Sequence, residues 1–442
     1  MDIREGQEFD LIVAGAGPAG FCAAVQAGRA GLKVALFEHF ALPGGSLTVL
    51  GSNSIDQFNN PHRPAGDRMV IAGIGWEFVK ELERRGFATI PDMDAPYRVH
   101  WQYGVRVNPI AAAQCMDDFL LEANVRLFYR QGIVSVEKTA TPEGIRLDAV
   151  IVTTKAGLVK HRAKMYIDCT GDGDLCVWAG ASFWTGESLQ PGSMRLYPDR
   201  NGASAEELQE IGAAWSAAVR QDPSLSDLLI GSVENLFAVG GDNINHICGL
   251  NTADSESRIQ AEIRARRGQV ALLKAIRESG SSARILGSAP ESAPRESRRI
   301  RGVRVMAGKE YLEKHVYDDA VCYTYWFVDL HREGQDAEII YLRDEKTPTI
   351  SLGALRPEGL KNVLCAGRCV SSDRACNSAI RVKASCMAMG QAAGAAAVLA
   401  LRQKAQNTAS VDPHEVRSFL RAQGAIVPAS FSCQRAAMGI EA

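Results

Sequence analysis

A glycine-rich turn near the start of the chain has the spacing of a phosphate-binding loop. Residues 15–20 read Gly-Ala-Gly-Pro-Ala-Gly, a GxGxxG pattern between an apolar run, 9–14, and a stretch with helical spacing, 19–30. In such a loop the first glycine allows a tight turn, the second admits a pyrophosphate, and the third lets helix pack on strand. The alternative is a turn with only a structural role. The pattern predicts a dinucleotide site that contains Gly15, Gly17, Pro18, Ala19 and Gly20.

A carboxylate follows this loop at the distance that suits a nucleotide ribose. Residues 33–38, KVALFE, form a second apolar run that ends in Glu38. In dinucleotide-binding units an acid about twenty residues beyond the loop accepts hydrogen bonds from a ribose hydroxyl. The order of apolar run, glycine turn, helix and apolar run is that of a βαβ unit in a parallel sheet. We therefore expect Glu38 to accept a hydrogen bond from a ribose hydroxyl of the dinucleotide.

Two more glycine-bearing strand ends lie far downstream, at 167–175 (IDCTGDGDL) and 362–370 (NVLCAGRCV). A simple nicotinamide enzyme has no reason to repeat such a feature. With Gly44-Gly45, these segments resemble FAD-dependent oxidoreductases of the glutathione-reductase-like superfamily, and look closest to the branch related to fumarate reductase and succinate dehydrogenase flavoproteins. RESRRIRG at 295–302 and SAIRVKASCMAMGQAAGAAA at 378–397 add to this resemblance, which spans nearly the whole chain.

The resemblance implies FAD as the cofactor and assigns contacts to it residue by residue. The implied contacts are Gly45, Ser46 and Thr48 along the ribityl chain and flavin edge, the backbone of Val134 at the adenine, Thr170, Gly171 and Asp172 at a strand end, and Gly367 and Arg368 near the ribityl phosphate. The first turn of the last long helix, around Ser378, Ala379 and Ile380, would face the flavin N1/O2 edge, where a helix N-terminus stabilises negative charge by about 0.3–2 kcal/mol. His39 lies close enough to the flavin-edge loop to leave covalent attachment open.

Arginine and histidine residues supply the candidate catalytic groups. Arg295 and Arg299 belong to a basic run that could clamp a substrate carboxylate, or form ion pairs on a solvated strand. His331 could move the proton that accompanies a hydride, and His246 is a second candidate. For both histidines the alternative is a hydrogen-bonded structural role. Members of the resembled group often carry a histidine where residues 371–374 read Ser-Ser-Asp-Arg, which leaves the proton-handling residue open.

The elements that must position these residues predict an α/β fold. We expect a doubly wound, Rossmann-like FAD-binding domain that is discontinuous, with an inserted α+β substrate domain. The predicted limits are 1–176 for the first part of the FAD-binding domain, 177–346 for the substrate domain, and 347–442 for the second part with C-terminal helices. Ligands favour domain interfaces and strand carboxyl ends, so the active site should lie between the two domains over the flavin face.

Composition and charge indicate which classes of partner and which cellular location to expect for this protein. The 442 residues carry a net charge of −2, which calls for neither nucleic acid nor a membrane surface. Eleven cysteines without a CxxC pair indicate free thiols in a reducing cytoplasm. The uncharged stretch 384–401 is rich in alanine and glycine and predicts a helix packed inside the protein rather than membrane insertion. No cluster of residues has metal-ligand spacing, so no metal is expected.

Taken together, these features predict a cytoplasmic FAD-dependent oxidoreductase that passes hydride between the flavin and a small polar substrate, with a carboxylate as one option. Two other classes stay open. FAD could be structural or support a hydration or isomerisation, or the chain could relay electrons as one subunit of a complex. A homo-oligomer or a redox partner protein is compatible with either. The single GxGxxG provides no second dinucleotide domain, so the electron donor or acceptor is left open.

Overall fold

A seven-stranded sheet forms the centre of the computed structural model, which describes residues 2–186, 188–229, 232–240, 246–332, 335–403 and 406–429. The strand order is β6-β2-β1-β9-β8-β7, and β20 also pairs with β9. The strands are β1 Arg4–Ala14, β2 Val34–Glu38, β6 Arg126–Tyr129, β7 Ile133–Thr141, β8 Gly144–Thr154, β9 Gly157–Asp168 and β20 Val363–Cys365. Strands β6, β2, β1, β9 and β20 run parallel, and β7 and β8 add an antiparallel hairpin.

The predicted βαβ unit is present. All five residues of β2 are buried, as are the last four of β1, which explains why both read as continuous apolar runs. Helix α1 (Pro18–Arg29) begins directly after the glycine turn, with Pro18 in its first turn, where a missing N–H costs no hydrogen bond. The α/β, Rossmann-like fold class is therefore confirmed.

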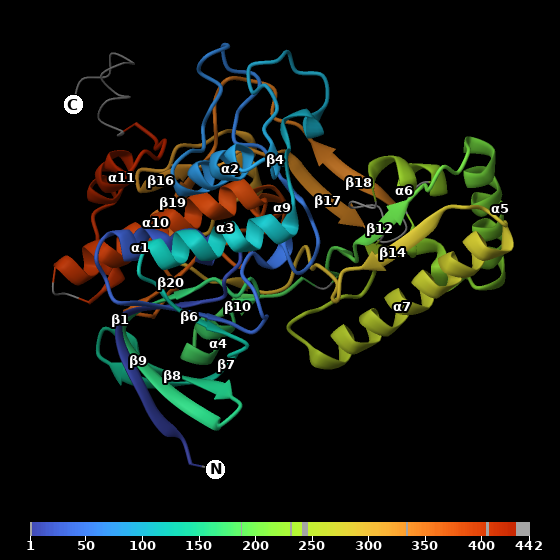
Figure 1. Ribbon diagram of the computed structural model, residues 1–442. Helices are drawn as coiled ribbons and strands as arrows, with labels where there is room; N and C mark the ends of the chain where they lie inside the picture. Colours follow the sequence, from blue (N-terminus) through green and yellow to red (C-terminus); the bar gives the residue numbers. More distant parts are fainter. Residues whose placement is uncertain are drawn as a thin grey trace.

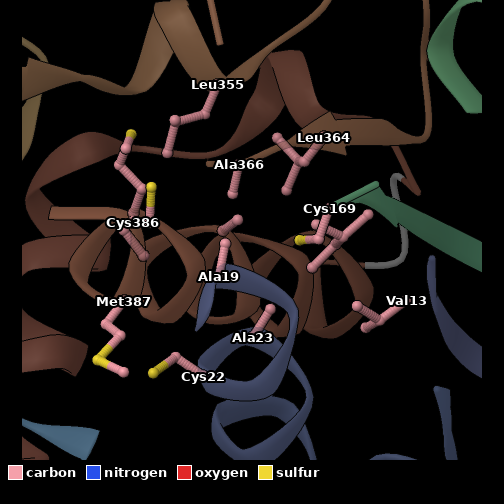
Figure 2. Close-up of a cluster of buried hydrophobic side chains, with 14 of the residues drawn as sticks. Val13, Ala19, Cys22, Ala23, Cys169, Leu355, Leu364, Ala366, Cys386 and Met387 are labelled. Atoms are coloured by element: carbon pink, nitrogen blue, oxygen red, sulfur yellow. The ribbon is translucent and has the colours of Figure 1, made fainter. Parts of the chain in front are cut away.

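Helix α1 packs against the late helix α10 (Lys383–Arg402), and both lie with α3 (Pro109–Glu122) on one face of the sheet (Figure 1). Figure 2 shows Ala19, Cys22 and Ala23 of α1 beside Cys386 and Met387 of α10. The helices approach so closely that a Cβ at Gly390 would lie 2.0 Å from the carbonyl oxygen of Ala19. The small residues of α10 therefore serve backbone-to-backbone packing.

Among the described residues, α10 is one helix long and apolar enough to cross a membrane, by length and composition alone. In this molecule 89% of its apolar window is buried, and the helix belongs to the main hydrophobic core. This burial agrees with the expected helix packed inside the protein.

A separate group of helices lies to one side of the sheet, at the right of Figure 1. It contains α5 (Ala205–Gln221), α6 (Val233–Val239) and α7 (Ser255–Glu278), with the antiparallel pair β12 (Leu196–Asp199) and β14 (Arg284–Ser288). These elements share a hydrophobic cluster of their own, which includes Leu208, Ile211, Trp215, Leu236 and Leu272. The domain limits at 176/177 and 346/347 stay a prediction.

Short elements complete the fold. The remaining helices are α2 Ile74–Arg84, α4 Asp174–Ala179, α8 Gly308–Leu312, α9 Arg374–Ile380 and α11 Pro413–Ala422, with 3-10 turns at Gly45–Leu47, His100–Tyr103, Pro223–Leu228, Leu352–Leu355 and Thr408–Ser410. The remaining strands are β3 Ser54–Ile55, β4 Ala88–Thr89 and β5 Val105–Val107 in one small sheet, and the pairs β10 Phe183–Trp184 with β15 Arg299–Ile300, β11 Gly192–Ser193 with β13 His246–Ile247, β16 Ala320–Tyr323 with β19 Thr349–Ser351, and β17 Val328–Arg332 with β18 Gln335–Ile340.

Candidate functional site

A cavity of about 470 Å³ lies at the carboxyl ends of the parallel strands. Residues that end or directly follow β1, β2, β9 and β20 line it, namely Ala14, Glu38, Cys169 and Ala366. In doubly wound sheets this edge collects the loops and the helix N-termini, and ligands bind there. The cavity is also lined by residues from three distant segments, 193–195, 252–258 and 291–294. It is the candidate functional site.

The three glycines of the loop have the three separate roles that the motif predicts. Gly15 has φ +92°, and a Cβ on it would lie 2.5 Å from the carbonyl oxygen of Cys169. Gly17 lines the cavity, and a Cβ there would meet nothing within 4 Å. A Cβ at Gly20 would lie only 1.8 Å from the carbonyl oxygen of Gly15. Gly20 therefore serves helix packing, and Gly17 leaves open space on the ligand side.

Glu38 is buried and held in a fixed orientation at one end of the cavity. Its carboxylate accepts hydrogen bonds from the backbone N–H groups of Ala16 (2.7 Å) and Phe40 (2.9 Å), and lies 2.9 Å from Nδ1 of His39. Burial would raise the pKa of Glu38, but these three donors outweigh it and hold the pKa below its usual value. In turn, the hydrogen bond to Glu38 raises the pKa of His39, which also lines the cavity. Glu38 is therefore an ionised acceptor at this end.

Asp172 joins three chain segments on the cavity wall. One of its oxygens accepts from Thr252 (2.7 Å), Ser297 (2.5 Å) and Arg368 (2.7 Å). Burial opposes ionisation of Asp172, but the charge of Arg368 and the hydroxyl donors lower its pKa. Arg368 also donates to Ser297, so the network is closed on itself. The predicted strand-end residues Thr170, Gly171, Asp172, Gly367 and Arg368 all line the cavity.

The start of α10 lies on the cavity wall, which corrects one prediction. Ser378, Ala379 and Ile380 end the preceding short helix, α9, and do not line the cavity. The chain becomes extended at Val382 (φ −65°, ψ 152°), and α10 begins one residue later. Arg381, Val382 and Lys383 line the cavity instead, and Lys383 donates to the Ser52 hydroxyl (2.8 Å) and the Ser54 carbonyl (2.6 Å).

Two further predicted cofactor contacts have side chains that do not line the cavity. Ile133 lines the cavity and the side chain of its neighbour Val134 is exposed, since successive strand residues face opposite sides. The contact predicted for Val134 is through its backbone, and it stays a prediction. Gly45 and Ser46 line the cavity as expected, but Thr48 is buried behind them and donates to the carbonyl oxygen of Pro43 (2.5 Å). The cavity wall continues at Leu50 and Ser52.

The two predicted catalytic arginines do not line the cavity. Arg299 forms a buried ion pair with Glu296, whose other oxygen accepts from Nε of Arg374 (2.9 Å). Arg295 is buried and donates to the carbonyl oxygens of Pro191 (2.5 Å) and Gly192 (3.1 Å). Both side chains are therefore engaged inside the protein, and a direct substrate contact by either stays a prediction.

The two predicted catalytic histidines lie behind the cavity wall. His331 and His246 are buried and pack edge to face, with ring centroids 5.0 Å apart. Burial lowers the pKa of both, and together with the charge of Arg295 it brings that of His246 to about 2. Nε2 of His331 lies 3.0 Å from Asp329, which in turn pairs with Arg381 on the wall (3.3 Å). The structure thus connects His331 to the cavity only through other side chains.

The cationic side chains at the start of α10, Arg381 and Lys383, are not among the site residues predicted from the sequence. Arg381 and Lys383 are charged residues at the entry to a helix whose next charged residue is Arg402, in its last turn. Cations at a helix N-terminus are unfavourable, and in this structure Arg381 pairs with Asp329 while Lys383 donates to Ser52 and Ser54. Arg195 and Asp56, which also line the cavity, carry no comparable signal in the sequence. Their proximity depends on the tertiary fold.

The cavity fits FAD by the chemistry of its wall. A pyrophosphate needs an open glycine and free helix N–H groups, which Gly17 and the start of α1 provide. A ribose needs a fixed acceptor, and Glu38 is one. A polar ring edge that gains negative charge suits the start of α10. Among the described residues, no three His, Cys, Asp or Glu side chains are grouped to hold a metal ion.

Comparison with known proteins finds similar sequences and similar solved structures. A 38-residue segment is 60% identical to the sarcosine oxidase subunit alpha of Rhizobium meliloti (strain 1021), but it covers 9% of this chain and 4% of that protein. Among solved structures, a flavoprotein/dehydrogenase from Cytophaga hutchinsonii matches with a TM-score of 0.44, 12% identity, and coverage of 94% of this chain and 86% of that one. A geranylgeranyl bacteriochlorophyll reductase-like protein from Thermoplasma acidophilum matches with a TM-score of 0.40, 13% identity, and coverage of 94% and 83%.

The family match extends over almost the whole sequence. The family described as FAD dependent oxidoreductase matches residues 10–420, a range that includes the glycine loop, Glu38, the Asp172 network and α10. The match therefore covers every segment that lines the cavity. This protein belongs to the FAD dependent oxidoreductase family, and FAD is its cofactor.

Proposed function

We propose that the chain binds FAD along the cavity and transfers hydride between the flavin and a small polar substrate at the end formed by Arg381 and Lys383. Gly15, Gly17 and the start of α1 would hold the pyrophosphate, and Glu38 the adenosine ribose. Bound FAD would supply the ring that accepts or donates the hydride. The protein's own residues supply binding, orientation and charge. The observation that supports this placement best is that the start of α10 faces the cavity with two cations.

The positive charges at the start of α10 favour negative charge on a ligand bound at this end of the cavity. Positive side chains and a helix N-terminus stabilise negative charge that develops on the ligand nearby, by about 0.3–2 kcal/mol for the helix end alone. Arg381 contributes from just outside α10, and Lys383 from its first position. Asp56 and Arg195 line the same cavity and offer further polar contacts to a substrate. We therefore propose a polar rather than an apolar substrate.

The role of His331 as the proton-moving residue stays a prediction. It would have to act through Asp329 and Arg381, because it does not line the cavity itself. The variant His331→Ala tests this role directly. Retained turnover in that variant would remove His331 from the reaction, whereas a loss of turnover with unchanged FAD content would support it.

The first test is the visible absorption spectrum of the purified protein before and after acid precipitation. It is followed by anaerobic titration with a panel of small hydroxy and unsaturated acids and amines. A yellow protein that one panel member bleaches would support the oxidoreductase and indicate its substrate. A protein with bound FAD that no panel member reduces would favour the alternative in which FAD is structural or supports hydration or isomerisation.

A partner protein is a second proposal, and the segment shared with the sarcosine oxidase relative favours it, because that relative is one subunit of an oxidase by name. Mass measurement by light scattering, alone and after co-purification, distinguishes a monomer, a homo-oligomer and a complex. The cytoplasmic location also stays a proposal. It is supported by ten free cysteines among the described residues, of which Cys248 is the only one not buried.

A further inference from the structure

A line of polar side chains runs from a buried strand to the cavity wall. It begins at His246 and His331, whose rings are in contact, and continues to Asp329 on β17. One oxygen of Asp329 lies 3.0 Å from His331, and the other lies 3.3 Å from Nη2 of Arg381. Arg381 lines the cavity just before α10 begins. The line therefore connects the interior with the ligand site.

Asp329 is the fixed anion in this line. Burial would raise its pKa, but the close approach of the His331 ring and the charges of Arg381 and Arg295 outweigh it and lower the pKa to about 2. The pKa values of His246 and His331 are both lowered, chiefly because burial disfavours the protonated, charged ring. Asp329 is therefore ionised beside neutral rings, and Arg381 is the cation with which it forms an ion pair.

The backbone holds Asp329 in place. Its N–H donates to the Ser378 hydroxyl at 3.0 Å, which ties β17 to α9. Strand β17 and helix α9 also lie side by side in Figure 1 and pack against each other. Because the Asp329 and Arg381 side chains are each only 15% exposed, solvent screens their interaction weakly. The carboxylate can thus fix the direction of the guanidinium group.

Arg381 has more hydrogen-bonding capacity than its partner uses. Its Nε is buried and has no hydrogen-bond partner, and its contact with Asp329 is at the long end of the range. A guanidinium group presents its N–H groups as a planar fork that matches a carboxylate. A ligand in the cavity meets the accessible part of the Arg381 side chain, which is 15% exposed, and not the enclosed Nε. Arg381 therefore offers a cationic donor to a ligand with acceptor atoms, on a wall to which Asp56 also contributes a carboxylate.

We propose that Arg381 binds a carboxylate group of the substrate and that Asp329 is a positioning residue that orients Arg381 for it. His331 supports Asp329 from behind and does not touch the substrate. This inference rests on the proposed function, since it takes the Arg381 end of the cavity as the substrate end. It assigns the substrate class as small carboxylates. Recognition of the carboxylate would then depend on the Asp329–Arg381 pair rather than on Arg295 and Arg299, which were predicted from the sequence.

Calorimetric titration of the FAD-loaded protein tests the ligand class without requiring turnover. Malonate is the probe, and malonamide and 1,3-diaminopropane are the neutral and cationic molecules of matched size. We expect malonate alone to bind, because only it offers carboxylate acceptors to Arg381. Equal binding of malonamide, or no binding of malonate, would overturn the proposal.

A double-mutant cycle tests the positioning role. Arg381→Met should weaken malonate binding at least about tenfold, the loss expected for one hydrogen bond to a charged group. Asp329→Asn should weaken it about threefold or more, but should change it by less than about twofold in the Arg381→Met background, because Asp329 acts through Arg381. An additive effect of the two substitutions would overturn the positioning role.

A matched control lies on the same hairpin. Glu338 forms an exposed ion pair with Arg332 and does not line the cavity, so Glu338→Gln removes a charge pair from the same hairpin and should leave malonate affinity unchanged. FAD content of each variant is read from its visible spectrum. If Arg381→Met loses FAD rather than malonate affinity, Arg381 serves the cofactor and the proposal fails. If malonate binds as expected but no panel acid reduces the flavin, the proposed oxidoreductase reaction fails while this inference stands.

Discussion

Gly17 and Gly20 are three residues apart in one loop and have opposite functions. Gly17 faces open space in the cavity, with a φ of −65° that any residue can adopt. Gly20 faces the carbonyl oxygen of Gly15 at a distance that leaves no room for a Cβ. A methyl group at one position therefore intrudes on the ligand, and at the other on the protein itself. Within this loop, Gly17 therefore serves ligand binding and Gly20 serves folding.

We expect Gly17→Ala to retain the stability of the FAD-free protein and to weaken FAD binding, because its methyl group projects into the cavity. Gly20→Ala should instead lower the free energy of unfolding by about 1–3 kcal/mol through overpacking. Chemical denaturation of the FAD-free proteins and fluorescence titration with FAD measure the two effects. Equal losses of stability in both variants would contradict this division of roles.

Asp174, on the cavity wall beside Arg298, is predicted to make stability depend on pH. Burial and the neighbouring charges of Asp172 and Asp168 raise its pKa to about 6. A raised carboxyl pKa means that the folded state holds the proton more tightly than the unfolded state, so stability falls as pH rises from about 4 to about 6.

The variant Asp174→Asn should remove this part of the pH dependence. Between pH of about 4 and about 7, the free energy of unfolding of the wild type should fall relative to that of the variant by up to about 3 kcal/mol. Urea denaturation at the two pH values measures the difference. A constant difference between the two proteins across this range would show that the pKa of Asp174 is not raised.

At the scale of the elements, the packing of α1 against α10 connects the two ends of the sequence. Gly390 and Gly394 are one helical turn apart and both face α1, where added Cβ atoms would lie 2.0 Å from the oxygen of Ala19 and 2.6 Å from that of Ala23. This close approach holds the start of α10 beside the glycine loop. The two helix N-termini therefore serve one cavity.

We predict that Gly390→Ala lowers the free energy of unfolding by at least about 1–3 kcal/mol, because the methyl group would force the two helices apart. It should also weaken FAD binding, since both helix ends would move. The matched control is Gly212→Ala in α5, where a Cβ meets nothing within 4 Å. That substitution should stabilise its helix by up to about 1 kcal/mol. A neutral Gly390→Ala variant in thermal denaturation would contradict the packing argument.

At the scale of the whole molecule, the cavity is built from both ends of the chain and its middle. The glycine loop and α10 form its floor with the strand ends, and residues 193–195, 252–258 and 291–294 line the rest. The Asp172 network and the ion pair between Arg258 and Glu291 belong to this shared wall. Cofactor binding should therefore reduce local opening in the middle of the chain as well as in the Rossmann-like part.

Hydrogen exchange with and without FAD tests this arrangement. FAD should slow exchange in the glycine loop and around Glu38, and also in 252–258 and 291–294, because a ligand lowers the population of locally opened states that it cannot bind. Helix α11 (Pro413–Ala422), which lies outside the cavity lining, is the internal control and should not change. Protection confined to the first forty residues would show that the middle segments do not close over the cofactor.

The sequence by itself determined the βαβ unit, the glycine loop and Glu38, because these depend on residues close together in the chain, whose spacing sets local geometry. It also determined the family, because several such local motifs recur along the chain in one order. Only the tertiary structure decided that the Ile133 side chain lines the cavity while that of Val134 is exposed, because side chains alternate along a strand. It also decided that α10 begins at Lys383 and that Asp329 pairs with Arg381, since both follow from packing between segments far apart in sequence. Local patterns specify what a loop can bind, and long-range packing specifies which side chains surround it.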